Sequence, residues 1–192
     1  MKRKMLAARE DLVNEVIEVA SRRGFTLYAL TNEALQRVIE ADRMGLSLSE
    51  VADGCKVLDA AKRGGFVLVP EMLLYEVLEK AYKETKDWMI KVWAESGEWF
   101  GKYYSFKNPE NNIEILRRDI CSLFWNVGEF NINKNENGGF SVKCVGSRFP
   151  ESYAAFLSAF LEGAFNALGY RCVEKHFAKG FVNLKFEALK EG

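Results

Sequence analysis

The segment FLSAFLEGAFNAL, at residues 156–168, constrains the fold more than any other part of the sequence. It is apolar on nearly every side of a helix, whereas a helix at a protein surface keeps one polar face. Pro150 precedes the segment and Gly169 follows it, and these residue types are typical of a helix start and a helix end. The sequence therefore predicts a buried, central helix over residues 151–168.

Apolar and polar residues alternate on both sides of this helix. Residues 129–132 and 140–145 alternate around a turn at 135–139, and residues 171–177 and 181–187 alternate around a turn at 178–180. Alternation with a glycine-containing turn is typical of a β-hairpin. Two hairpins joined by one helix predict an α+β fold with antiparallel strands and packed helices.

The residues before the first hairpin are predicted to be mainly helical. Ser47 and Glu50 have the spacing of a capping box, and Thr31 and Asn32 are candidate N-caps of the preceding helix. We expect a mainly helical region over residues 1–105, which serves as a cap or for dimerisation, followed by a ligand-binding domain over residues 106–192. Helical spacing predicts helices over 5–20, 32–44, 47–62 and 110–125, with short strands over 25–30 and 66–69. It also predicts a long helix from residue 71 that Ser96 and Gly97 weaken.

Charge and cysteine content exclude several classes of protein. Lys and Arg together number 27, as do Asp and Glu, which argues against nucleic acid as the main partner. No apolar run approaches the roughly 18 residues needed to cross a membrane. The 4 cysteines are scattered without a C-x-x-C pair, so we expect a cytoplasmic protein with reduced thiols.

The last third of the chain resembles a known domain family. Residues 140–187 carry a hairpin, the helix FLSAFLEGAFNALGY, and a closing pattern of Val173, Ala178-Lys179-Gly180 and Phe186. This arrangement is similar to the 4-vinyl reductase domain, especially its archaeal predicted hydrocarbon-binding type. The resemblance implies an apolar pocket between helix and sheet that takes a small hydrophobic molecule.

One departure from this family affects the expected metal chemistry. Many members carry a cysteine before the glycine turn and another after it, where this sequence has His176 and Asn183. The departure predicts that this chain binds no zinc, and the lack of a cofactor motif predicts that it binds no cofactor.

Rings on and near the central helix form the candidate ligand site. Phe156, Phe160 and Ala164 share one stripe of the predicted helix, and small residues lie on the neighbouring stripes. With Trp125, and with Tyr153 as a polar handle, we expect them to border a cavity for an apolar or aromatic ligand. An ordinary close-packed core would use the same residues, so that alternative stays open.

Cys144, Cys172 and His176 are the candidate metal ligands. Strand alternation places Cys172, Glu174 and His176 on one face, and four such ligands would suit zinc. The alternative is that the cysteines are core residues and that Glu174 and His176 face solvent. The sequence carries no nucleophile elbow, phosphate loop or HExxH motif, which favours a binding protein over an enzyme.

Residues 25–62 suggest an alternative function in transcription. A short strand followed by two helices is similar to a ribbon-helix-helix module, whose strand enters the DNA major groove. Here the strand offers Thr26 and Tyr28 but no basic residue, and residues 1–70 carry 11 basic and 10 acidic residues. The charge needed to attract DNA is therefore missing.

The predicted helix after Pro70 carries more ring area than the surface of a monomer usually shows. Exposed apolar patches of this kind often mark interfaces. The sequence therefore predicts a homodimer through the N-terminal helical region. The rings concerned are Trp88, Trp93, Trp99, Tyr103 and Tyr104.

Overall fold

The computed structural model describes residues 4–107 and 109–189. The chain forms two compact units, Met1–Lys56 (unit 1) and Val57–Gly192 (unit 2). The boundary expected near residue 105 falls inside unit 2, because the helix before it packs on the central helix. Within the described ranges, no helix has both the length and the apolar character to cross a membrane.

Unit 1 is helical. It contains α1 (Glu10–Arg23), α2 (Leu27–Arg43) and the first half of α3 (Leu48–Arg63). The capping box of α3 is confirmed, because Glu50 Oε2 accepts from the backbone N–H of Ser47 at 2.7 Å and Ser47 Oγ accepts from that of Glu50 at 3.2 Å.

The strand predicted over residues 25–30 is wrong. Thr26, rather than Thr31 or Asn32, caps α2, and its Oγ1 accepts a hydrogen bond from the backbone N–H of Ala29 at 3.1 Å. This bond satisfies a free donor at the helix start and favours helix over strand. A ribbon-helix-helix module therefore lacks its DNA-reading strand here.

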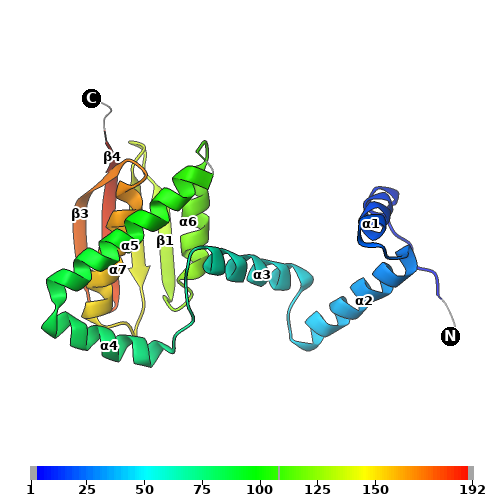
Figure 1. Cartoon of the computed structure of the whole chain (residues 1–192), viewed down its shortest axis with the longest axis horizontal. Helices are drawn as coiled ribbons and strands as arrows, with labels where there is room; N and C mark the ends of the chain where they lie inside the picture. Colours follow the sequence, from blue (N-terminus) through cyan, green and yellow to red (C-terminus); the bar gives the residue numbers. More distant parts are fainter. Residues whose placement is uncertain (1–3, 108, 190–192) are drawn as a thin grey trace. The chain divides into compact units, whose positions relative to one another are not determined.

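The predicted α+β fold and both hairpins are confirmed in unit 2 (Figure 1). The sheet is antiparallel with the order β1-β2-β4-β3, so β4 inserts between β2 and β3, which α7 connects. The elements of unit 2 that follow α3 are α4 (Glu71–Glu84), α5 (Lys86–Lys107), α6 (Asn112–Leu123), β1 (Glu129–Lys134), β2 (Phe140–Val145), α7 (Glu151–Asn166), β3 (Tyr170–Ala178) and β4 (Phe181–Ala188).

Two predictions for the segment between α3 and α6 are wrong. Residues 66–69 form a loop instead of a strand, and Phe66 packs edge-on against Phe100 with ring centroids 5.5 Å apart. This side-chain contact, rather than strand pairing, holds the loop. The single helix expected from residue 71 is divided at Thr85, whose φ of −141° and ψ of 35° interrupt the helix.

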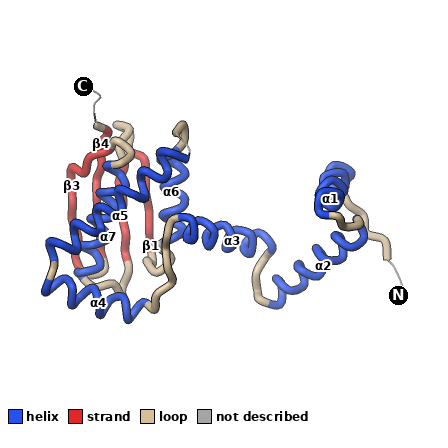
Figure 2. The backbone as a smooth tube through the Cα atoms, in the orientation of Figure 1, coloured by secondary structure: helices blue, strands red, loops and turns tan. Residues whose placement is uncertain are grey.

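Helix α7 lies between the sheet on one side and α5 on the other (Figures 1 and 2). This position buries thirteen of its sixteen residues, which confirms the predicted central helix. The face of the sheet toward α7 is apolar and buried. It carries Phe140, Val142 and Cys144 of β2 and Val182, Leu184 and Phe186 of β4.

Helices α5 and α7 approach each other at glycines. A Cβ added to Gly97 of α5 would lie 1.9 Å from the carbonyl oxygen of Phe160, and one added to Gly163 of α7 would lie 2.0 Å from that of Ala94. Only glycine permits so close an approach of two backbones. The low helix propensity of glycine predicts that the helix weakens at Ser96 and Gly97. Helix α5 nevertheless continues to Lys107, because the tertiary contact at Gly97 outweighs that preference.

Candidate functional site

Three of the four predicted ligand-site residues lie together in the core of unit 2. Tyr153, Phe156 and Phe160 are 3%, 0% and 7% exposed. The ring of Trp93 stacks on Phe156 with centroids 5.7 Å apart and an interplanar angle of 22°. Trp125, the fourth residue, is 57% exposed. The structure therefore gathers the α7 residues in a ring cluster, defined as Tyr153, Phe156, Phe160 and Trp93, and leaves Trp125 outside it.

A line of hydrogen bonds connects the surface with Tyr153. Asn126 Nδ2 donates to the hydroxyls of both Tyr75 and Tyr153, at 3.3 Å each. The hydroxyl of Tyr75 donates to Glu71 Oε1 at 3.0 Å, and Glu71 forms an ion pair with the exposed Arg148 at 3.2 Å. Burial raises the pKa of both tyrosines, which keeps the two hydroxyls neutral. The Tyr153 hydroxyl, which was expected to bind a polar group of the ligand, is thus already hydrogen-bonded to Asn126.

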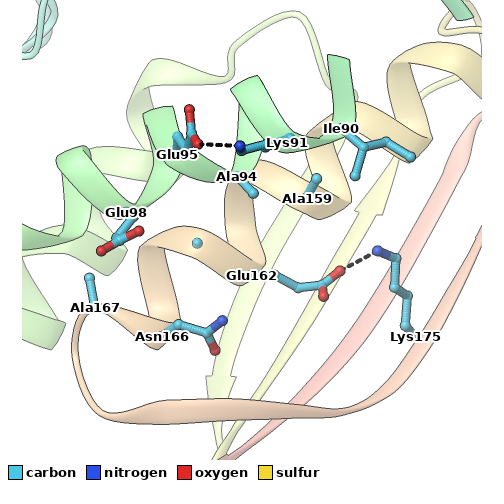
Figure 3. Close-up of a pocket in the computed structure, with 11 residues that line it drawn as sticks. Ile90, Lys91, Ala94, Glu95, Glu98, Ala159, Glu162, Asn166, Ala167 and Lys175 are labelled. Atoms are coloured by element: carbon cyan, nitrogen blue, oxygen red, sulfur yellow. Dashed lines mark hydrogen bonds and ion pairs between the residues drawn. The ribbon is translucent and has the colours of Figure 1, made fainter. Parts of the chain in front are cut away.

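A groove lies on the surface of unit 2 between α5 and α7 (Figure 3). Its volume is about 340 Å³. Helix α5 provides Ile90, Lys91, Ala94, Glu95 and Glu98, helix α7 provides Ala159, Glu162, Gly163, Asn166 and Ala167, and β3 provides Lys175.

The floor of this groove consists of small residues because the two helices approach so closely. Gly163 meets the backbone of α5 at Ala94, and Ala159 lies one turn before Gly163 on the same stripe of α7. Larger side chains at these positions would hold the helices apart. The contact that joins α5 to α7 therefore also produces the apolar floor.

The rim of the groove is charged. Glu162 of α7 forms an ion pair with Lys175 of β3, and both side chains are largely shielded from solvent, at 27% and 33% exposure. Lys91 and Glu95 face each other along α5 at 3.8 Å. An ion pair beside an apolar surface can exchange one partner for a charged group of a ligand.

A β-bulge in β3 directs Lys175 toward the groove. Cys172 lies opposite Phe186, but Glu174 lies opposite Lys185, so Val173 is an extra residue in the strand. The bulge reverses the alternation, which places Lys175 on the face toward α7. Sequence reasoning missed Lys175 because nothing in the alternating pattern signals the bulge.

The same bulge separates the candidate metal ligands. Cys172 faces α7, whereas Glu174 and His176 lie on the outer face, where His176 is exposed opposite Asn183. The prediction that these three residues share one face is therefore wrong. Cys144 is fully buried on the face toward α7. In the part of the chain that the structure describes, no three His, Cys, Asp or Glu side chains are placed to hold a metal ion.

Thiol labelling checks this placement of the cysteines. Burial raises the pKa of Cys121, Cys172 and Cys144, whereas Cys55 is exposed. Because the thiolate is the reactive form, iodoacetamide at pH 8 should modify Cys55 first and Cys144 only after unfolding. Peptide mass spectrometry over time would measure the order. Equal rates at Cys55 and Cys144 would contradict it.

Comparison with known proteins assigns no family to this chain. No protein-family model and no curated protein matches the sequence. A solved structure described as "Probing the function of heme distortion in the H-NOX family" aligns over 71% of this chain and 87% of that chain, with a TM-score of 0.38 and 15% identity. Similarity at this level carries no inference about function. The relation of residues 140–187 to the 4-vinyl reductase domain stays a prediction.

Proposed function

We propose that this chain is a non-catalytic binding or sensing protein for a small molecule with an apolar or aromatic body. We place the ligand in the groove between α5 and α7. The observation that supports this proposal is a concavity of about 340 Å³ with an apolar floor and a charged rim. Small-molecule sites are usually concave and mainly apolar, with a few polar groups that orient the ligand.

The charged rim of the groove predicts that the ligand also carries a polar or charged group. The ion pair between Glu162 and Lys175 is held by two different elements, α7 and β3. A ligand group that replaces one partner would keep the other partner paired, and the displaced side chain, which is already about one-third exposed, would turn to solvent. The apolar body of the ligand would then cover Ala94 and Ala159.

The ring cluster is a second location for the same function. It combines large rings with the polar line that leads from Arg148 to Tyr153. The resemblance to the 4-vinyl reductase domain favours an apolar ligand at this place. Because Phe156 is fully buried, the rings would have to move apart before a ligand could enter.

Two substitutions distinguish these locations. Ala94 is partly exposed in the groove, so Ala94→Leu should fill the groove, and thermal unfolding of the same variant is measured because Ala94 also lies where α5 meets α7. We expect this change to weaken binding at least tenfold in titration calorimetry against a panel of indole, naphthoate and phenylalkylamines. Tyr153→Phe removes the buried hydroxyl and should leave binding in the groove unchanged.

The controls use the same panel of ligands. Ala52→Leu makes the same change at an exposed position of α3 and should leave binding unaltered. Loss of binding in Tyr153→Phe alone would place the ligand in the ring cluster. A wild-type protein that binds no member of the panel would contradict the proposal.

A further inference from the structure

Unit 1 has no hydrophobic core of its own. Among its described residues, 4–56, only Ala20 and Ala41 are buried. Burying two methyl groups contributes about 2 kcal/mol at most. Ordering the backbone costs about 1–2 kcal/mol for each residue. Domains below roughly 70–80 residues that lack such a core often add a metal, disulfides or oligomerisation. The helices of unit 1 therefore need a further apolar surface.

Helices α1 and α2 each present apolar side chains to solvent. Positions 27, 35, 38 and 39 share one face of α2, and positions 12 and 16 lie one turn apart on α1. Their side chains are between 37% and 53% exposed. We call these six residues the apolar face of unit 1. They are Leu12, Val16, Leu27, Leu35, Val38 and Ile39.

The exposed apolar side chains of unit 1, taken together, have about the area of one side of a specific interface. Ile17, Phe25 and Met44 are also 46%, 49% and 63% exposed. With the apolar face they present on the order of 800 Å² of side-chain surface, which is about what each partner buries in a standard interface.

The charge of unit 1 indicates what covers this face. Residues 1–56 carry nine basic and nine acidic residues. Nucleic acid or an anionic membrane would call for a basic excess, and a strongly charged protein partner would call for the opposite charge. A surface of mixed charge with no net charge is compatible with a second copy of itself. In a twofold-symmetric dimer, the same residues of both copies form the interface.

We propose that unit 1 binds unit 1 of a second copy of this chain. Helices α1 and α2 of the two copies form a four-helix bundle whose core is the apolar face. This interface lies in unit 1, whereas the rings expected from the sequence belong to α5 of unit 2, where Trp93 and Tyr104 pack inside and Trp88 and Trp99 are exposed. The inference goes beyond the proposed function and does not depend on it.

Sedimentation equilibrium of the full chain tests the dimer. We expect twice the chain mass of 21.9 kDa at micromolar concentration. Leu35→Lys should raise the dissociation constant at least 100-fold, because a lysine would be buried at the centre of the bundle. Gln36→Lys adds the same charge next to it on an exposed position off the apolar face and should change the constant less than threefold. A monomeric wild type, or equal effects of both lysines, would overturn the proposal.

Two single-cysteine variants locate the contact between the copies without introducing a charge. In a Cys55→Ser background, Ile39→Cys should form a disulfide between copies at least tenfold faster than Gln36→Cys under mild oxidation. Non-reducing electrophoresis measures the two rates. Equal rates would place any dimer contact away from the apolar face and would also overturn the proposal.

Discussion

Gly163→Ala should destabilise unit 2 by about 3 kcal/mol, at the upper end of what overpacking a core costs. The new methyl group would lie 2.0 Å from the carbonyl oxygen of Ala94 and 2.8 Å from the backbone nitrogen of Glu98. These are backbone atoms and cannot rotate away, so α5 and α7 would have to separate. Thermal unfolding followed by circular dichroism should show Tm lowered by roughly 6–12 °C.

Two further glycines serve as comparisons for this result. Gly97→Ala places a methyl group 1.9 Å from the carbonyl oxygen of Phe160 and should be as damaging. Gly54 is also helical, but nothing lies within 4 Å of an added Cβ. Gly54→Ala should therefore stabilise its helix by up to about 1 kcal/mol. A Gly163→Ala protein with the Tm of the wild type would contradict the close contact between the helices.

Phe165→Ala should cost about 3–5 kcal/mol, the range for removing a fully buried ring. Phe165 of α7 is 0% exposed and stacks on Phe186 of β4, with ring centroids 4.2 Å apart and an interplanar angle of 13°. It also contacts the rings of Phe140 and Tyr170. The substitution would leave a cavity between helix and sheet, and urea unfolding would measure the loss.

The matched control for this change is another phenylalanine on a helix of unit 2. Phe106 of α5 is 94% exposed, so Phe106→Ala should change the free energy of unfolding by no more than about 0.5 kcal/mol. If the two alanine variants unfold at the same urea concentration, Phe165 does not join α7 to the sheet as described.

The sequence alone was sufficient for the elements whose pattern is local. The two hairpins follow from alternation around glycine turns, and α7 follows from a run that is apolar on all sides. The capping box at Ser47 and Glu50 could be predicted from the spacing of these two residues alone. The strand expected over residues 25–30 failed because the same residues alternate and also fit a helix. The N-cap at Thr26 favours the helix, and no strand lies among the described residues of unit 1 to pair with this segment.

The candidate site was only partly visible in the sequence. Tyr153, Phe156 and Phe160 lie together on α7, as the spacing of three and four residues predicts, and their role in ligand binding stays a prediction. The groove beside them was not predicted. Its floor depends on α5 meeting α7, and Lys175 reaches its rim only through a bulge in β3.

What the sequence determined by itself is the periodicity of three features: the two hairpins, the helix that is buried on nearly every side, and the capping box at the start of α3. Only the tertiary structure decided that Gly97 lies inside a long helix, that Lys175 turns toward α7, and that Trp93 belongs to the core. Periodicity arises from backbone geometry within a few residues. The approach of two backbones depends on partners far apart in the sequence, and no local pattern records it.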